Sequence, residues 1–313
     1  MSRALPAPGS MGAWVLASRP ATLPVAVAPV VVGVAVASRV APVHWGGAVA
    51  ALLGALLIQI GTNFANDVFD HEKGTDDEAR IGPPRAVQKG LLSAAAVRTG
   101  MAIVFGLATL AGVYLAWVGG PVIVAIGVAS ILSGIAYTGG PYPLGYHGLG
   151  DVFVFIFFGP VAVMGTTWVA VGQLPAGAFA ASVPIGALAT AVLVINNVRD
   201  RAGDARSGKR TVVVRFGRAF GVALHGALHV LSAVVPLAAV VLGWLPASSL
   251  LALPILWIGF RVTKTLATTD AGASLTDGEP GEKLNPLLGR QAKVLLAFAA
   301  VFSSGIAWSH VFG

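Results

Sequence analysis

Long apolar segments alternate with short polar connections along the whole chain. Nine of these segments approach or exceed the roughly 20 residues that a helix needs to cross the hydrocarbon core of a bilayer. They lie at residues 21–38, 44–65, 95–117, 120–138, 150–171, 176–197, 219–243, 245–266 and 289–311. The Pro and Gly residues inside them are compatible with transmembrane helices, which tolerate both. The pattern therefore predicts an all-α fold, a polytopic membrane bundle of nine transmembrane helices.

The composition strengthens this prediction. Hydrophobic residues make up 56% of the chain and charged residues only 11%, whereas a soluble domain carries about 25% charged residues. We therefore expect a single integral-membrane domain over residues 1–313, in contact with the lipid bilayer, with an N-terminal tail over residues 1–18 that is free to move. Cysteine is absent, which excludes disulfides, thiolate metal sites and cysteine nucleophiles.

The charged residues lie on one side of the predicted bundle. With nine spans, the N-terminus and the connections after the second, fourth, sixth and eighth spans share a side, and of the 20 Lys and Arg residues only Arg39 falls outside these regions. The positive-inside rule makes this side cytoplasmic. Membrane topology thus explains the basic composition, and we expect no nucleic-acid partner. All 13 acidic residues share that side. Because orientation rules hardly constrain Asp and Glu, this predicts a polar active site facing the cytoplasm.

Two clusters of carboxamide and carboxylate side chains stand where two of the apolar segments end. The first cluster contains Asn63, Asn66, Asp67 and Asp70, and the second contains Asn196, Asn197, Asp200 and Asp204. The spacing i, i+3, i+7 places Asn63, Asn66 and Asp70 on one helical face, and the spacing i, i+4, i+8 does the same for Asn196, Asp200 and Asp204. A single Asn-Asp pair at a helix end is usually a cap. Two matched clusters on the same side of the membrane favour a shared binding site instead.

The side-chain oxygens of these clusters indicate a magnesium site. Mg²⁺ keeps several waters and is usually bound by one or two carboxylates together with substrate phosphates. Cations follow each cluster in the sequence: Arg85, Lys89, Arg206, Lys209 and Arg210. Guanidinium and ammonium groups beside carboxylate-bound metal are typical of a diphosphate clamp. We therefore expect two or more Mg²⁺ ions to bridge a diphosphate bound between the clusters.

At the two clusters and the cations that follow them, the chain resembles the UbiA superfamily of membrane prenyltransferases, and the similarity extends over nearly the full chain. Members of the superfamily have nine transmembrane helices and two Asp-rich motifs. Within the superfamily the chain is most similar to the 1,4-dihydroxy-2-naphthoate polyprenyltransferase branch (MenA). The motifs behind this narrower resemblance are Ser18-Arg-Pro-Ala-Thr-Leu-Pro24, Tyr137-Thr-Gly-Gly-Pro-Tyr-Pro-Leu-Gly145, and Asn196-Asn-Val-Arg-Asp200 running into Gly208-Lys-Arg-Thr-Val-Val-Val-Arg-Phe-Gly217, of which the last stretch is the most specific.

The resemblance implies a function and a set of site residues. It implies transfer of a polyprenyl group from polyprenyl diphosphate to 1,4-dihydroxy-2-naphthoate with loss of CO₂, giving demethylmenaquinone in a bacterial inner (cytoplasmic) membrane. It also implies catalysis by Asp67, Asp70, Asp200 and Asp204, which with Asn66 would bind the metal. Where the general first motif has a third Asp, this chain has Gly74. Whether Asp76 or Asp77 binds metal instead is left open by the sequence.

Further residues are expected to bind substrate, and other functions stay open. Asn63 shares the face of the first cluster, Asn196 and Asn197 begin the second, and Tyr137 and Tyr142 can stabilise a carbocation or orient the acceptor. An alternative is a UbiA-type enzyme with another acceptor, such as 4-hydroxybenzoate, homogentisate or a haem vinyl group. Another is an ion-coupled transporter, which predicts charges near mid-membrane and on both faces. The sequence predicts neither the prenyl chain length nor the oligomeric state.

Overall fold

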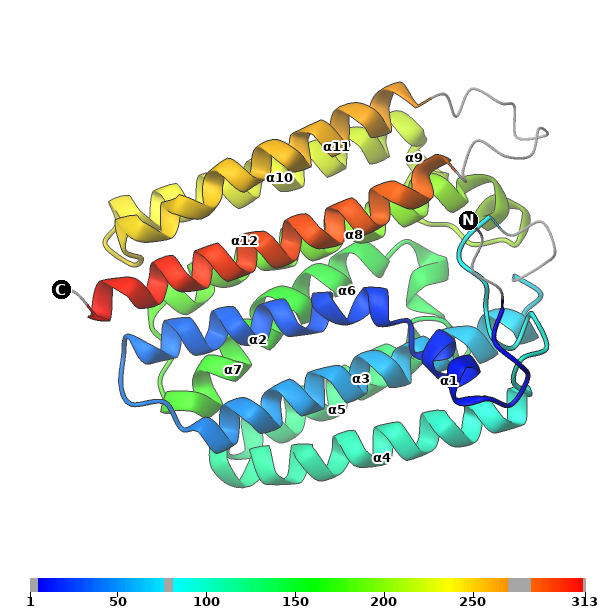
Figure 1. Cartoon of the computed structure of the whole chain (residues 1–313), viewed down its shortest axis with the longest axis horizontal. Coiled ribbons are helices and arrows are strands. Elements are labelled where there is room, and N and C mark those ends of the chain that lie inside the picture. The colour runs from blue at the N-terminus through cyan, green and yellow to red at the C-terminus, as the bar shows by residue number, and fades with distance from the viewer. Residues whose placement is uncertain (1–4, 76–80, 270–282, 312–313) are drawn as a thin grey trace.

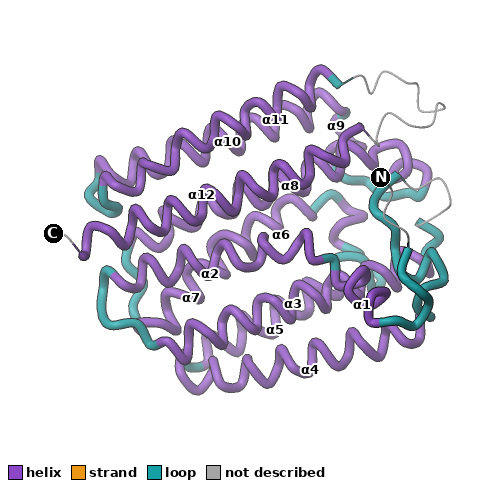
Figure 2. The backbone as a smooth tube through the Cα atoms, in the orientation of Figure 1, coloured by secondary structure: helices purple, strands orange, loops and turns teal. Residues whose placement is uncertain are grey.

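The computed structural model describes residues 5–75, 81–269 and 283–311, and in these ranges every regular element is helical (Figures 1 and 2). The elements are α1 Met11–Ser18, η1 Pro20–Thr22, α2 Leu23–Ser38, α3 Trp45–Glu72, α4 Ala94–Gly119, α5 Pro121–Ala136, η2 Leu144–His147, α6 Gly150–Ile156, η3 Phe157–Val161, α7 Ala162–Val171, α8 Ala176–Arg206, α9 Val212–Phe216, α10 Arg218–Val241, η4 Ala247–Ile255, α11 Leu256–Thr268 and α12 Asn285–Val311. The predicted all-α fold is confirmed.

The number of membrane-crossing helices also agrees with the prediction. Within the described residues, eight helical segments are long and apolar enough to cross a bilayer: 11–38, 45–72, 94–119, 150–171, 176–206, 218–241, 247–268 and 285–308. The ninth predicted span corresponds to α5, which is apolar throughout but has only 16 residues. The long helices run side by side, and their connections gather at two ends of the bundle (Figure 1).

Two helices extend further than the apolar pattern predicts. The spans predicted at 44–65 and 176–197 continue as α3 to Glu72 and as α8 to Arg206, which adds about two turns to each helix. Hydropathy marks only the part of a helix that faces apolar surroundings, so it misses turns whose side chains contact polar groups. Both acidic clusters therefore lie on rigid helices, not in the connections that follow them.

The segment 150–171 is a single span with a change of helical type at its centre. It consists of α6, the π-helical turn η3 and α7. Pro160 lies within η3, and because Pro lacks an amide hydrogen it interrupts the α-helical hydrogen bonding there. Gly159 contacts α8 closely, since a Cβ added to it would lie 3.0 Å from the Cα of Gly186. Small residues at this crossing let the two backbones approach each other.

The N-terminal residues differ from the expected tail over residues 1–18. Residues 11–18 form α1, where the Ser10 side chain accepts a hydrogen bond from the Ala13 amide. Ala13 and Ala17 are buried against the C-terminal part of α3. The Trp14 ring packs edge-on against Phe64, with centroids 5.6 Å apart. These apolar contacts fix α1 beside α3, which hydropathy along the chain does not reveal.

Helix α8 is the centre of the bundle. It packs against α2, α6, α10 and α12, and its residues take part in two of the three hydrophobic clusters in the described chain. The third cluster joins α1, α3, the connection 85–92 and the start of α4. At one end of the bundle lie α1, α9 and the connections 85–92, 138–149 and 207–211 (Figure 1). We call this the polar end, and it holds the ends of α3 and α8.

Candidate active site between α3 and α8

Asp70, in the last turn of α3, is held by two donors from outside that helix. The Arg85 guanidinium donates to one carboxylate oxygen at 2.8 Å, and the Tyr146 hydroxyl donates to the other at 2.9 Å. The Asp70 side chain is only 2% exposed. A buried carboxylate is tolerated only where it is paired and hydrogen-bonded, so Arg85 and Tyr146 stabilise its charged form.

Asp67 fixes the connection that carries Arg85. Its carboxylate accepts hydrogen bonds from the backbone amides of Ala86 and Val87, at 3.1 and 3.4 Å. It therefore acts as a cap for the turn that begins at Arg85. Asp67 is 1% exposed and faces this turn, whereas the family resemblance implies that it binds metal. In this geometry Asp67 positions the guanidinium that pairs with Asp70.

The carboxylates on α8 are also paired with cations. Asp204 lies 3.9 Å from the Lys209 ammonium in the connection that follows α8. Asp200 accepts two hydrogen bonds from the guanidinium of Arg199, at 2.7 and 2.6 Å. That guanidinium also donates to Asn285 at 3.0 Å, at the start of α12. Asp204 is buried, and Asp200 is the more accessible of the two.

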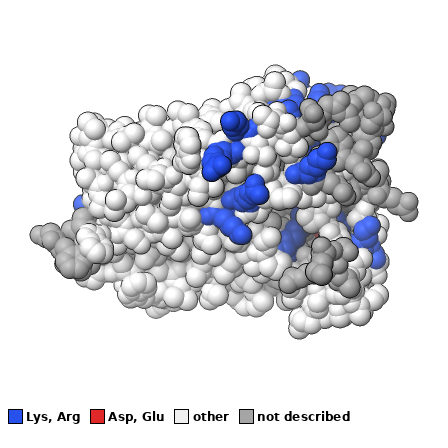
Figure 3. All heavy atoms as spheres, turned by 45° about the horizontal axis from the view of Figure 1, so that its top comes forward, with Lys and Arg blue, Asp and Glu red and all other residues white. Residues whose placement is uncertain are grey.

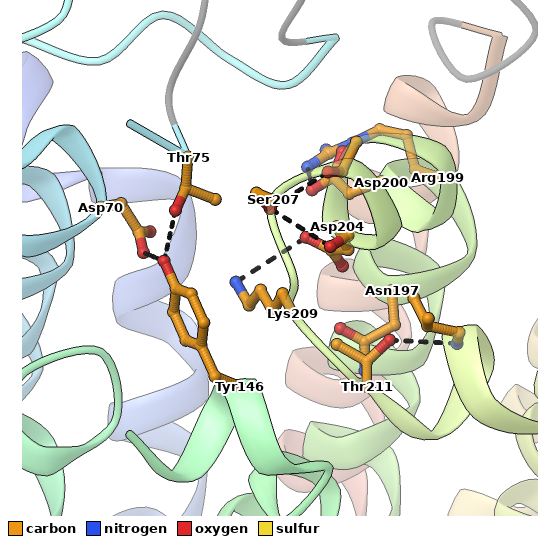
Figure 4. Close-up of polar contacts among 12 residues, drawn as sticks. Asp70, Thr75, Tyr146, Asn197, Arg199, Asp200, Asp204, Ser207, Lys209 and Thr211 are labelled. Carbon is orange, nitrogen blue, oxygen red and sulfur yellow. Dashed lines mark hydrogen bonds and ion pairs between the residues drawn. The ribbon is translucent and has the colours of Figure 1, made fainter. Parts of the chain in front are cut away.

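Tyr146 connects the two clusters (Figure 4). While its hydroxyl donates to Asp70, it also bonds to the Thr75 hydroxyl. The ammonium groups of Lys73 and Lys209 lie 4.7 and 5.3 Å from the centroid of its ring, within the range of a cation–π interaction. Lys209 is close enough to Asp70 and Asp204 to interact electrostatically with both. We use the term mouth for the residues Asp70, Lys73, Thr75, Arg85, Tyr146, Asp204 and Lys209.

The loop that carries Tyr146 is fixed to the connection that carries Lys209. The Arg210 amide donates to the Tyr146 carbonyl at 2.8 Å. The Arg215 guanidinium donates to the carbonyls of Arg210 and His147, at 3.1 and 2.9 Å. Backbone and side-chain hydrogen bonds thus hold η2 against the residues that follow α8, which places the Tyr146 ring between α3 and α8.

An apolar cavity of about 490 Å³ lies inside the bundle next to the mouth. Its polar lining includes Arg19, Asn63, Asn66, Tyr137 and Asn196, and Asn66 and Asn196 stand one helical turn before Asp70 and Asp200. The remaining lining is mostly apolar and comes from α2, α3, α4, α5, α6, α7, α8 and η3, with residues such as Val30, Ile58, Leu115, Ile131, Phe157 and Val169. The cavity therefore offers a long apolar chain a place to bind beside a charged head-group site.

The polar lining residues are themselves hydrogen-bonded. The Asn63 amide donates to the Ser18 carbonyl at 2.9 Å and to the Thr22 hydroxyl at 3.0 Å, so it ties α3 to the junction between α1 and α2. The Asn66 side-chain oxygen accepts from the Thr138 hydroxyl at 2.9 Å. These bonds orient both carboxamides at the cavity wall.

Tyr137 and Lys73, which each follow the end of a helix at the polar end, have shifted pKa values. Burial raises the pKa of the Tyr137 phenol, and the nearby carboxylates of Asp151, Asp204 and Asp70 act in the same direction. The phenol therefore keeps its proton at physiological pH and serves as a hydrogen-bond donor. Burial lowers the pKa of Lys73, an effect that Asp70 opposes and Lys209 reinforces.

The structure does not bring all the expected binding residues into contact with the carboxylates. Lys89, Arg206 and Arg210 have exposed side chains. Tyr142 is 58% exposed and its ring stacks on His147, with centroids 3.6 Å apart, so it lies outside the cavity lining. Asn197 turns away from Asn196 and donates to the Asp151 carboxylate at 3.3 Å.

Two other residues at the site gave no sequence signal that distinguished them. Tyr146 and Lys73 take part in the contacts described above, and the Tyr137–Gly145 motif ends one residue before Tyr146. The position of Tyr146 depends on loops that pair in three dimensions. Arg199 lies within the Asn196–Asp200 motif, but its pairing with Asp200 was not predicted. Asp76 and Asp77, whose role the sequence leaves open, lie outside the described residues.

The donor set fits Mg²⁺ that arrives with a phosphate group. The described residues contain no group of three or more His, Asp or Glu side chains that would hold an ion unaided. Asp70 on α3 and Asp204 on α8 both lie near Lys209, and Asn66 lies one turn from Asp70. Mg²⁺ is usually bound by one or two carboxylates plus substrate phosphates. Two carboxylates and a carboxamide are therefore a suitable set of protein ligands for it.

The fold and the mouth define a membrane protein of a known class: residues 26–275 match the UbiA prenyltransferase family, to which the chain belongs. Over 302 residues it is 37% identical to the 1,4-dihydroxy-2-naphthoate octaprenyltransferase of Mycobacterium tuberculosis, covering 96% of this chain and 99% of that protein. It is 34% identical to the protein of the same name from Haemophilus influenzae, covering 94% and 95% of the two chains. The resemblance drawn from the motifs is confirmed.

Solved structures share the fold. A UbiA homolog from Aeropyrum pernix K1 superposes with a TM-score of 0.69 at 14% identity, covering 92% of this chain and 98% of that chain. A UbiA homolog from Archaeoglobus fulgidus bound to DMAPP and Mg²⁺ superposes with a TM-score of 0.61 at 15% identity, covering 93% and 99%. At these identities the likeness concerns the fold alone, and it confirms a UbiA-type bundle.

Proposed function

We propose that this protein transfers a polyprenyl group from polyprenyl diphosphate to 1,4-dihydroxy-2-naphthoate. The observation that carries the proposal is that a charged site and an apolar cavity lie next to each other. A mouth of carboxylates from α3 and α8 and of cations from the connections that follow these helices stands directly beside an apolar cavity of about 490 Å³. A diphosphate head joined to a long hydrocarbon tail matches both, and the relatives named above support this substrate pair.

The diphosphate binds at the mouth. Asp70, Asp200 and Asp204 would hold Mg²⁺, with Asn66 as a further oxygen donor, and bound Mg²⁺ supplies charge neutralisation for the diphosphate oxygens. The cations Arg85 and Lys209, which pair with Asp70 and Asp204, reach diphosphate oxygens that the metal leaves uncovered. Asp67 contributes by positioning Arg85.

The reaction joins a carbon of the naphthoate ring to the first carbon of the prenyl chain. The allylic C–O bond breaks and its electron pair leaves with the diphosphate, while the ring carbon bearing the carboxylate forms the new C–C bond. That carbon then loses CO₂, whose bonding electrons return to the ring and leave demethylmenaquinol. Oxidation of this quinol to demethylmenaquinone needs a separate external oxidant. The apolar cavity wall excludes water that would otherwise capture the allylic cation.

The acceptor binds between the tail and the mouth. Tyr137 and Asn63 line this part of the cavity. The Tyr137 phenol, protonated at physiological pH, donates a hydrogen bond to an acceptor oxygen and so orients the ring toward the allylic carbon.

A transfer assay with purified protein tests the proposal. Labelled polyprenyl diphosphate is supplied with 1,4-dihydroxy-2-naphthoate, 4-hydroxybenzoate or homogentisate, in Mg²⁺ and in EDTA. We expect a prenylated naphthoquinol product, formed only with the metal, and its recovery when Mg²⁺ is restored. Preferred prenylation of another acceptor refutes the acceptor assignment. Absence of transfer to every acceptor by folded protein refutes the reaction class.

We further propose that the protein lies in a bacterial cytoplasmic membrane with the mouth facing the cytoplasm, as the Lys and Arg distribution supports. The chain has no cysteine, so single cysteines introduced at the exposed positions Lys89 and Arg39 report each side without further engineering. In intact cells a membrane-impermeant maleimide should label Arg39→Cys and not Lys89→Cys. The reverse pattern would invert the orientation.

A further inference from the structure

Four cations form two pairs on neighbouring helices away from the cavity. Arg261 and Lys264 lie one turn apart on α11, and Arg290 and Lys293 lie one turn apart on α12. All four side chains are exposed. The two helices pack together and run in opposite directions (Figure 1). Arg261 and Lys293 therefore lie at a similar distance from the polar end, and so do Lys264 and Arg290. We call these four residues the cation patch.

The cation patch has no acidic counterpart among the residues that the structure describes. Helices α11 and α12 contain neither Asp nor Glu. None of the four side chains makes a hydrogen bond or an ion pair with any described residue. Figure 3 shows Lys and Arg side chains gathered on the face where these helices lie. A concentrated positive charge of this kind favours an anionic partner.

The patch lies at the boundary between apolar and polar surface. Along α11 the exposed residues Trp257, Ile258 and Phe260 come directly before Arg261, and on α12 the exposed Leu296 follows Lys293. Arg261 and Lys293 stand about 10 to 12 Å inside the ends of their helices at the polar end, from a rise of about 1.5 Å per residue. Phospholipid phosphates lie where acyl chains end, so we expect the patch at head-group depth, with the exposed apolar residues beside the acyl chains.

The patch is separate from the substrate cavity. All residues that line the cavity lie between Arg19 and Asn196 in the chain. The inward faces of α11 and α12, with Leu266 and Leu295, pack into the hydrophobic clusters around α8. An anion bound at the patch therefore contacts the outer surface of the bundle, where bilayer lipid is the neighbour.

We propose that the cation patch is a binding site for the head group of an anionic phospholipid of the inner leaflet. The two cations on α11 and the two on α12 bind the phosphate of one lipid between them. The exposed apolar residues beside these cations contact the acyl chains of the same lipid. Basic sites between transmembrane helices on the cytoplasmic side bind such head groups in this way. The inference rests on the proposed orientation, which puts the polar end at the inner leaflet, and is independent of the proposed reaction.

Lipid titration of the full-length protein tests the inference. Purified protein in neutral detergent is titrated with phosphatidylglycerol or phosphatidylcholine, and bound lipid is counted by native mass spectrometry. We expect the variant R261Q/K264Q/R290Q/K293Q to bind phosphatidylglycerol at least about tenfold more weakly than the wild type. The matched control R261K/K264R/R290K/K293R keeps every charge and should bind like the wild type. Equal binding by the Gln variant overturns the inference.

Two further arms keep the test decisive. If the four-fold Gln variant fails to fold, the variants R261Q/K293Q and K264Q/R290Q each remove one level of the patch and should each weaken binding about threefold. A last variant neutralises the acidic residues that follow α11 in the sequence, Asp270, Asp277, Glu279 and Glu282. If phosphatidylglycerol binds only to that variant, those residues occupy the patch and the inference is wrong.

Discussion

Replacing Tyr146 with Phe removes one hydroxyl from the centre of the mouth and leaves the ring in place. Asp70 then loses the hydrogen bond of 2.9 Å from that hydroxyl but keeps the Arg85 guanidinium at 2.8 Å. A hydrogen bond to a charged group contributes about 1.5 to 3 kcal/mol, and the remaining partner argues for the lower end. A loss of about 1.5 kcal/mol corresponds to a decrease of about tenfold in kcat/KM for the diphosphate.

Removing the ring as well distinguishes its two contributions. Tyr146→Leu also abolishes the cation–π contacts with Lys73 and Lys209, at 4.7 and 5.3 Å. Each contributes about 0.5 to 1 kcal/mol at an accessible site, so this variant should lose about fivefold or more beyond the Phe variant.

Steady-state prenyl transfer measures both variants against a matched control. Tyr114→Phe removes a hydroxyl from α4, where Tyr114 lies near Trp117 and near Gly46 in the first turn of α3, at the other end of that helix from Asp70. We expect this control to retain wild-type kcat and KM. If Tyr146→Phe behaves like Tyr114→Phe, the hydroxyl does not organise Asp70 and the bridging role of Tyr146 is refuted.

Three other variants address single contacts of the site. Asp204→Asn keeps the size of the side chain but removes a buried carboxylate, so turnover should fall about 100-fold or more while thermal unfolding shows a folded protein. Near-normal turnover would show that Asp204 has no part in the site. Asp67→Ala removes the acceptor of two backbone amides and should destabilise the protein by about 1 to 2 kcal/mol in denaturant unfolding, with faster proteolysis at 85–92; an unchanged connection would contradict its role as a cap. Gly150→Ala places a Cβ about 2.8 Å from the Tyr137 hydroxyl, so it should displace that hydroxyl and raise KM for the acceptor more than KM for the diphosphate. A larger effect on KM for the diphosphate would contradict the proposed contact between Tyr137 and the acceptor.

The helical bundle was predictable because hydropathy is a local property. Each apolar segment needs only its own residues to be recognised, so the spans and their number follow from the sequence. The limits appear where a helix leaves apolar surroundings. Helix α3 continues to Glu72 and α8 to Arg206, and the polar side chains there gave no hydropathy signal. Helix α1 likewise depends on Phe64 and Val68 of a different helix.

The candidate site was predictable in its charges but not in all its pairings. The spacing on two helices and the cations after them predict the neighbourhood of Asp70 with Arg85 and of Asp204 with Lys209. Which way Asp67 faces depends on how the connection 85–92 folds back over α3. The position of Tyr146 depends on a backbone hydrogen bond to Arg210, 64 residues away in the chain. Sequence spacing carries no information about either.

The apolar cavity beside a single charged mouth also affects how a turnover ends. Both proposed substrates carry an anionic group, a diphosphate on one and a carboxylate on the other, which cations at the polar end such as Arg85 and Lys209 would attract. The quinol product has lost both groups, so it carries no negative charge for these cations to attract. Its affinity therefore drops as a direct result of the bonds that were broken, and it can diffuse sideways into the bilayer without a separate ejection step.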